Sequence, residues 1–154
     1  MEKIIDLVDG HFGRGYSSAY FEDGRLKEGY KLMSSDNAFI LYSEHNSAFQ
    51  LPYKKVLFLN VVVVDKANQG KGEGSKLLSN FYERFSAEYT IVVPLWKYKG
   101  SEGLRHWILK KNGTLFHSFN EYWRDDSLEK GYHCLECGPP PCRCSMDLYV
   151  LDQQ

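Results

Sequence analysis

The sequence predicts an α/β fold in which helices flank a mixed β-sheet, and three observations support this prediction. Residues 56–64 form an almost unbroken apolar run, which is typical of a strand buried on both faces at the centre of a sheet. From Leu77 to Phe85 the apolar residues recur with helical spacing, which predicts an amphipathic helix that packs on the sheet. Predicted strands and helices alternate along the 154-residue chain, whose length suits a single domain over residues 1–154.

The N-terminal part of the sequence contains one clear helix and one clear strand. Apolar residues from Ile4 to Phe12 lie at helical spacing, and the glycines at positions 13 and 15 end the pattern. The run AFILYS favours a strand, and an Asp-Gly pair indicates a turn. In chain order we expect a helix over 3–12, a turn at 23–24, a second helix over 26–33, a strand over 38–43, a turn at 44–46 and a strand over 47–51.

The C-terminal part alternates between strands and one helix. The run YTIVVPL is rich in β-branched residues and predicts a buried strand. Ser101 is a suitable N-cap for the helix that follows, and Asn112-Gly113 suits a left-handed helix end. The expected elements are a strand over 89–95, a helix over 101–111, and strands over 114–119 and 146–151.

A glycine-rich loop, Gln69-Gly70-Lys71-Gly72-Glu73-Gly74, lies between the central strand and the amphipathic helix. The amides at the start of a helix are unsatisfied and carry partial positive charge, and glycines let a phosphate approach them closely. Lys66, Lys71 and Lys76 add positive charge nearby. The loop has neither the spacing of a Walker A motif nor that of the dinucleotide-binding fingerprint.

The loop instead fits the pattern Gln/Arg-x-x-Gly-x-Gly/Ala through Gln69, Gly72 and Gly74. With the preceding strand and the following Leu-Leu, it resembles the pyrophosphate loop of the GNAT superfamily of N-acetyltransferases, which use acetyl-CoA. The resemblance covers residues 38–119 and implies the acyl-CoA N-acyltransferase fold, with a central splayed mixed sheet and a strand bulge near Val63. It also implies that acetyl-CoA contacts Val62, Val63, Val64, Gln69, Gly70, Lys71, Gly72, Glu73, Gly74 and Ser75.

The resemblance further implies direct attack of an amine on the thioester, with a base for the amine proton and an acid for the leaving thiolate. Many family members take the acid from a tyrosine on the later helix, but this chain has Ile108 or Leu109 at that position. His106 is our working assignment for the acid and Glu44 for the base. The alternatives are Tyr98 for the acid, and His45, Asn60 or an ordered water for the base.

All 4 cysteines fall within one short segment, at Cys134, Cys137, Cys142 and Cys144. The first pair has the Cys-x-x-Cys spacing of a zinc knuckle, and the glycine after it permits a tight turn. Four clustered thiolates suit a structural Zn²⁺ in an insertion at about 120–145, which by the resemblance flanks the acceptor entrance. Two disulfides, an iron–sulfur cluster and unligated thiols stay open as alternatives, and so does His133 as a ligand.

Composition narrows the class of function. The net charge of −1 argues against binding of nucleic acid through bulk charge. The sequence lacks the pattern of a secretory signal and an apolar run of membrane-spanning length, so we expect a cytoplasmic protein without a membrane partner. The leading function is transfer of the acetyl group of acetyl-CoA to a primary amine of a small molecule or peptide. The alternative is a zinc-stabilised CoA-binding module without turnover; a homodimer is left open.

Overall fold

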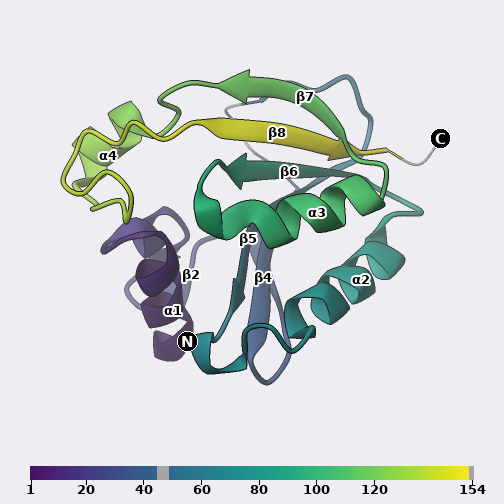
Figure 1. The fold of residues 1–154 in the computed structure, drawn as a ribbon, viewed down its shortest axis with the longest axis horizontal. Coiled ribbons are helices and arrows are strands. Elements are labelled where there is room, and N and C mark those ends of the chain that lie inside the picture. The colour runs from purple at the N-terminus through teal and green to yellow at the C-terminus, as the bar shows by residue number, and fades with distance from the viewer. Residues whose placement is uncertain (45–48, 153–154) are drawn as a thin grey trace.

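The computed structural model describes residues 1–44 and 49–152, and it contains a six-stranded mixed sheet with helices on both faces (Figure 1). The strands of this sheet lie in the order β3-β4-β5-β6-β8-β7, and β1 and β2 form a separate hairpin. The strands are β1 (Phe21–Glu22), β2 (Arg25–Leu26), β3 (Tyr30–Ser34), β4 (Ala38–Ser43), β5 (Val56–Val64), β6 (Thr90–Trp96), β7 (Thr114–Phe119) and β8 (Met146–Leu151). The helices are α1 (Glu2–Phe12), α2 (Glu73–Phe85), α3 (Glu102–Lys110) and α4 (Arg124–Lys130), with short 3-10 helices η1 (Tyr16–Ala19), η2 (Lys66–Asn68) and η3 (Lys99–Ser101).

The central strands β5 and β6 run parallel but separate after three residue pairs. Residues Val56 to Phe58 pair with Thr90 to Val92, whereas β5 continues to Val64 and β6 to Trp96 without further mutual pairing. Figure 1 shows β4 and β5 running in a direction different from that of β6, β8 and β7. The predicted splayed mixed sheet is therefore confirmed, and the β6 side of β5 beyond Phe58 has no strand partner within the described residues.

A bulge interrupts β5 at Asn60. Two consecutive residues of β4, Leu41 and Tyr42, pair with Val61 and Leu59, so Asn60 is the extra residue on its strand. Its side chain donates a hydrogen bond to a serine hydroxyl at the end of β4 at 2.9 Å. The resemblance predicted a bulge farther along this strand, and the observed bulge lies three residues before that position.

The bulge reverses which side chains of β5 face each helix layer. Before it, odd-numbered residues such as Leu59 pack in the core beneath α2 and α3. After it, the odd-numbered Val61 and Val63 pack in the second core, on the side of α1. Because a shift of one residue exchanges the two faces of a strand, Val62 and Val64 turn toward the α2 side.

Helices α2 and α3 cover one face of the sheet, and α1 covers the other. Leu77, Leu78 and Phe81 of α2 are buried together with Trp107 and Ile108 of α3. On the opposite face α1 contributes a fully buried valine to a separate apolar cluster. The amphipathic helices predicted from the spacing of apolar residues are thus confirmed. Among the helices of the described residues, none has the length and apolar character needed to cross a membrane.

Two elements predicted in the N-terminal half are wrong. Residues 26–33 do not form a helix, because β2 ends at Leu26, Gly29 takes a φ of +91°, and β3 begins at Tyr30. Pairing of β3 along the whole of β4 decides the extended conformation there, and local spacing could not reveal that partner. The strand predicted over 47–51 lies partly outside the described residues, and residues 49–51 are not in a strand. His45 also lies outside the described residues.

The turn predicted over 44–46 lies partly outside the described residues. The other predicted helices and strands agree with their predicted bounds to within a residue or two, and the two ends of α3 differ in how well they match. Ser101 occupies the N-cap position, but its hydroxyl donates to the carbonyl of Tyr98 at 2.7 Å instead of capping the helix. At the other end Asn112 is left-handed with a φ of +59°, and the Gly113 amide donates to the Ile108 carbonyl at 3.0 Å. This is the helix end that the Asn-Gly pair predicted.

Candidate active site

A cavity of about 660 Å³ lies between the diverging halves of β5 and β6. One end is bordered by the glycine-rich loop at the start of α2, and the other by the cysteine-rich loop, residues 131–145, between α4 and β8. Its central walls come from β5 on one side, and from β6 and the start of α3 on the other. The cavity therefore connects the two motifs that the sequence singled out, which lie about 60 positions apart in the chain.

The glycine-rich loop presents the start of α2 to the cavity. Gly70 and Gly72 take φ values of +80° and +78°, a left-handed conformation that other residues rarely adopt. A Cβ atom on Gly74 would lie 3.0 Å from Cγ2 of Val64, so glycine lets the helix begin directly against the end of β5. Because the first amides of a helix lack partners within the helix, this end of the cavity suits an anion.

Gln69 ties this loop to β5 and to α1. Its Nε2 donates to the Val64 carbonyl at 3.1 Å and lies 3.1 Å from Nε2 of His11. Nδ1 of His11 in turn lies 3.1 Å from the Leu7 carbonyl, so a neutral imidazole can donate there and accept from Gln69. Burial, with the nearby Lys66 as a smaller cause, lowers the pKa of His11 and favours this neutral form.

Most of the residues predicted to contact acetyl-CoA line the cavity. These are Val62, Val64, Gln69, Gly70, Gly72, Glu73, Gly74 and Ser75. Within the described residues, the lining does not include Val63, which packs on the α1 side, or Lys71, which is exposed. The two working catalytic assignments also lie elsewhere. Glu44 accepts a hydrogen bond of 2.6 Å from Tyr89 beyond the far end of β4, and His106 is exposed on α3.

Tyr98, which lies just before α3 in the chain, is a tyrosine of the cavity lining. Of the two positions that align with the usual family tyrosine, Ile108 is fully buried and Leu109 is 50% exposed. Tyr98 lines the cavity, and its ring stacks on Trp96 with 3.6 Å between the ring centroids. Burial, and to a smaller extent the charge of Glu136, raises the pKa of Tyr98, so its hydroxyl keeps its proton well above neutral pH.

The four cysteines converge on one point. Their Sγ atoms all lie within 4.8 Å of one another, and Sγ of Cys144 is 3.6 Å from that of Cys134 and 3.5 Å from that of Cys137. All are free thiols, and Cys134, Cys142 and Cys144 are buried. Zinc with Zn–S bonds of about 2.3 Å in a tetrahedron holds its sulfurs about 3.8 Å apart, which fits this cluster.

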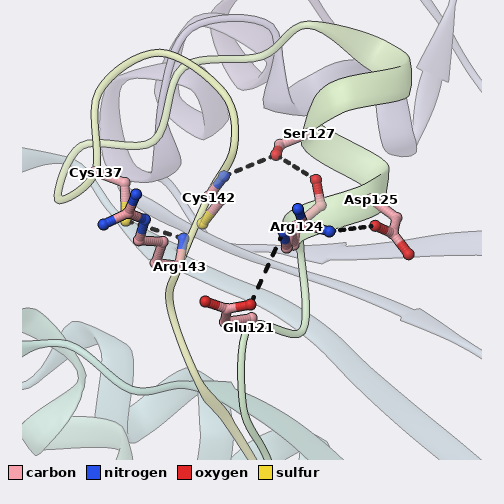
Figure 2. A network of polar contacts seen from close by, with 7 residues as sticks. All are labelled: Glu121, Arg124, Asp125, Ser127, Cys137, Cys142 and Arg143. Atoms are coloured by element: carbon pink, nitrogen blue, oxygen red, sulfur yellow. Dashed lines mark hydrogen bonds and ion pairs between the residues drawn. The ribbon is translucent and has the colours of Figure 1, made fainter.

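Two further observations fit a metal-bound thiolate cluster. The Arg143 amide donates to Sγ of Cys137 at 3.2 Å, as Figure 2 shows, and such a bond stabilises negative charge on sulfur. The buried indole Nε1 of Trp96 has no hydrogen-bond partner among the described residues. Trp96 packs in the same buried cluster as Cys134, Cys142 and Cys144. Burial raises the pKa of the Cys144 thiol, and the neighbouring Trp96 side chain lowers it to a smaller extent. A thiolate at that position would give the indole an acceptor.

The cysteine-rich loop is anchored on α4. Cys134 and Gly138 exchange two backbone hydrogen bonds, of 3.0 and 2.8 Å, and Gly138 supplies a φ of +78° for the turn. Ser127 of α4, which is fully buried, accepts a hydrogen bond from the Cys142 amide at 2.9 Å and donates one to the Arg124 carbonyl at 2.8 Å (Figure 2). These bonds hold the loop from the side of α4.

The same loop also packs on the end of α1, and Figure 1 shows the two segments side by side. The His133 amide donates to the Arg14 carbonyl at 3.0 Å, and the Leu135 amide donates to the Phe12 carbonyl at 3.4 Å. A Cβ atom on Gly13 would lie only 1.6 Å from the His133 carbonyl oxygen, so only glycine permits this contact. The cysteine-rich loop and α1 therefore form one wall of the cavity together.

Comparisons with known proteins identify the fold. No family model matches the sequence, and no curated protein matches it either. The structure is similar to the ribosomal-protein-S18-alanine N-acetyltransferase of Escherichia coli, with a TM-score of 0.59 and 10% identity over 98% of this chain and 88% of that chain. It is also similar to a protein from Desulfovibrio desulfuricans assigned to the GNAT family, with a TM-score of 0.52 and 13% identity over 80% of this chain and 69% of that chain. The chain has the GNAT fold.

A third structure with the GNAT fold, Arabidopsis thaliana NAA60, was solved in complex with acetyl-CoA. Its TM-score to this chain is 0.51, with 6% identity over 75% of this chain and 65% of that chain. For several other neighbours the match spans 61 to 64% of their own length. At these identities the similarity establishes the fold, and the acceptor has to be inferred from the residues of this chain.

The sequence did not predict several residues that line the cavity, because no local sequence pattern connects them. They come from four separate segments and meet only when the chain folds: His11, Trp96, Trp123 and Tyr132. The signal that could have found them is the high aromatic content, 15%, but that number does not say which rings share a cavity.

Proposed function

We propose that this protein is an acetyl-CoA-dependent N-acetyltransferase whose acceptor is the primary amine of a small molecule or peptide. The observation that carries the proposal is the continuous cavity. It joins the anion-binding start of α2 to an aromatic end, along an edge of β5 that has no strand partner in the described residues. The GNAT fold and the similarity to a structure that holds acetyl-CoA support the same function.

The glycine-rich loop provides the phosphate-binding end. Its backbone amides and the partial positive charge at the start of α2 suit the pyrophosphate of acetyl-CoA. Along the cavity, the unpaired edge of β5 around Val62 offers backbone groups to the amides of the pantetheine arm, which would bind as an added strand. The thioester then lies toward the aromatic end, where the acceptor enters.

In the reaction the amine nitrogen attacks the acetyl carbonyl carbon, the carbon–sulfur bond breaks, and the leaving thiolate takes up a proton. We assign that proton to the hydroxyl of Tyr98, which lines the cavity and whose raised pKa keeps it protonated. Glu44 and His106 lie outside the cavity, so we assign removal of the amine proton to water instead of either side chain.

We also propose that Cys134, Cys137, Cys142 and Cys144 hold a structural zinc ion. Three observations support this assignment: the four sulfurs converge, the Arg143 amide donates to one of them, and the Trp96 indole, which has no hydrogen-bond partner among the described residues, packs in the same cluster. When bound, the metal supplies crosslinks within a loop whose own apolar core is small. The ordered loop would then hold in place the cavity wall that it forms with α1, and in this way contribute to substrate binding.

Release of thiol from acetyl-CoA in the presence of a panel of primary amines tests the proposed transfer. We expect amine-dependent thiol release and a matching mass increase of the amine by one acetyl group. The alternative is a zinc-stabilised CoA-binding module without turnover, which the missing tyrosine at positions 108 and 109 favours. Saturable binding of CoA without thiol release for any amine would contradict acetyl transfer and support that module.

A further inference from the structure

Five aromatic side chains form a continuous wall at the end of the cavity near the cysteine-rich loop. This aromatic wall consists of Phe12, Tyr16, Trp96, Tyr98 and Tyr132, all of which line the cavity. From Tyr98 onward, each ring contacts the next: the centroid distances are 3.6 Å to Trp96, 5.7 Å on to Phe12, 5.3 Å on to Tyr16, and 5.3 Å on to Tyr132. The rings come from α1, η1, the end of β6, the residues between β6 and η3, and the segment after α4. Such a surface suits a flat, apolar ligand.

The polar atoms of two of these rings are already engaged. The hydroxyl of Tyr16 lies 3.2 Å from that of Tyr20, and the hydroxyl of Tyr132 donates to Asp126 at 2.9 Å. Asp126 is also paired with Lys130 at 2.8 Å, so its charge is neutralised behind the wall. Burial raises the pKa of Tyr16 to about 12, so this phenol stays uncharged.

Apart from the tyrosines and the cysteines, the titratable side chains of the described lining are located at the other end of the cavity. His11 contacts Gln69, Lys66 belongs to η2 just before the loop, and Glu73 accepts a hydrogen bond from Asn37 at 2.9 Å. No carboxylate of the described lining stands at the aromatic end to pair with an ammonium group. Contact with apolar rings disfavours the charged form of an amine, and the neutral form is the one that attacks a thioester.

We infer that the acceptor is a small primary amine carried by an aromatic ring, and that the ring lies against the aromatic wall while the amine points toward the splay of β5 and β6. The inference rests on the proposed acetyl transfer and names its substrate class. The cavity volume of about 660 Å³ has to contain the pantetheine arm as well as the acceptor, which favours a small molecule over a protein segment. A polyamine would leave its additional charge without a partner.

Steady-state kinetics with the zinc-loaded wild-type protein test the inference directly. The panel consists of 2-phenylethylamine and tryptamine, the aliphatic amine n-butylamine, the polyamine spermidine, and a short peptide with a free N-terminus. Because burial of a phenyl ring removes a large apolar area from water, we expect kcat/KM to be about fiftyfold higher for 2-phenylethylamine than for n-butylamine. Equal or higher values for spermidine or the peptide would overturn the inference.

Two variants of Tyr16, one without the aromatic ring and one with it, test whether the ring binds the amine. In Tyr16→Leu the ring is lost, and KM for 2-phenylethylamine should rise about tenfold, with KM for acetyl-CoA unchanged. In Tyr16→Phe the ring is kept, and KM for the amine should stay within about twofold of the wild-type value. Equal KM values for the amine in both variants and the wild type would contradict binding on the wall. Should Tyr16→Leu fail to fold, competition by N-acetyl-2-phenylethylamine against the amine in the wild-type protein decides the same question.

Binding measurements separate a failure of this inference from a failure of the proposed function. Quenching of tryptophan fluorescence by 2-phenylethylamine reports occupation of the wall, because Trp96 belongs to it. Saturable quenching without thiol release would overturn acetyl transfer and leave the aromatic ligand class supported. Thiol release with spermidine and none with the aromatic amines would keep acetyl transfer and overturn the inferred acceptor.

Discussion

The two ends of the cavity are built in different ways. The end that we propose binds acetyl-CoA, the cofactor end, is made of backbone amides placed by glycines within one continuous segment, residues 69–75, and its geometry depends on local conformation. The end that we propose binds the amine, the acceptor end, is made of side chains from α1, η1, the end of β6, the residues just after it and the cysteine-rich loop, which meet only in the folded chain. Backbone amides in one short segment suit a ligand that many proteins share. Side chains from separate segments can differ between proteins, so they suit an acceptor that is specific to each protein.

The difference also concerns what keeps each end in place. The loop at the cofactor end packs on β5 and α2, which belong to the main core of the sheet. The acceptor end depends on a loop that contributes four thiols and few apolar contacts, with a separate small cluster around Trp96. We therefore expect substitutions at the acceptor end to act by disordering the cysteine-rich loop. Substitutions at the cofactor end should act by weakening the binding of acetyl-CoA. Four predictions test this contrast.

The largest effect is expected for the double change Cys134→Ser and Cys137→Ser. It removes two of the four sulfur ligands, so bound zinc should fall from about one ion per chain to near zero, with a loss of about 4 kcal/mol or more in the free energy of unfolding. Metal analysis and thermal unfolding measure the two outcomes, and acceptor preference should change with them. His133→Ala is the matched control, because His133 is outside the sulfur cluster. Unchanged metal content in the double variant would refute the zinc site.

The next largest effect is expected for Gly13→Ala, which tests the contact between α1 and the cysteine-rich loop. Its new methyl group would collide with the His133 carbonyl, so the loop has to move and the free energy of unfolding should fall by about 3 kcal/mol. Gly24→Ala is the control, because Gly24 also has a positive φ, +73°, but has open space around it. Equal losses in the two variants, measured by chemical denaturation, would show that backbone strain alone matters at position 13.

A smaller effect, confined to the chemical step, is expected for Tyr98→Phe. The ring and its stacking on Trp96 are kept while the proton donor is lost, so kcat should fall about thirtyfold with KM for acetyl-CoA unchanged. In the wild type, the raised pKa keeps the Tyr98 hydroxyl protonated up to the ordinary tyrosine pKa of about 10, so the rate should decline only above that pH. This decline should be absent in Tyr98→Phe. Tyr122→Phe, whose ring is outside the cavity lining, is the control. An unchanged kcat in Tyr98→Phe would exclude Tyr98 as the acid.

The smallest change in stability is expected for Gly72→Ala at the cofactor end. Gly72 and Gly24 both take left-handed conformations with open space around them, so alanine at either position should cost about 1 kcal/mol of stability. Only Gly72 lines the cavity, where the added methyl group keeps a phosphate from the amides of α2. Acetyl-CoA should therefore bind about tenfold more weakly to Gly72→Ala and with unchanged affinity to Gly24→Ala, as measured by calorimetry. Equal affinities would place the pyrophosphate elsewhere.

Much of the fold could be predicted from sequence because its signals are local. The buried run at 56–64, the apolar stripe of α2 and the Asn-Gly end of α3 each carry their own pattern. The region 26–33 could not be read in this way, because its extended conformation comes from pairing of β3 with β4. The bulge at Asn60 was likewise misplaced, since it is defined by the register with the neighbouring strand.

In the candidate site too, residues close in sequence were predicted and residues far apart in sequence were not. The glycine-rich loop and the four cysteines were found because their residues are close in sequence, and the structure brings each set together. Glu44 was chosen because its strand was expected to border the acceptor side, and His106 because it lies one turn before Leu109. The structure places both outside the cavity lining. The aromatic wall joins positions as distant as 12 and 132, so only the fold reveals it.

The central claim is that the cavity between β5 and β6 holds acetyl-CoA, and calorimetric titration of acetyl-CoA into the zinc-loaded protein tests it most directly. We predict one saturable site per chain, with affinity reduced by Gly72→Ala and retained in Gly24→Ala. Absence of saturable binding in the folded wild-type protein, or equal binding by the two glycine variants, would contradict the account.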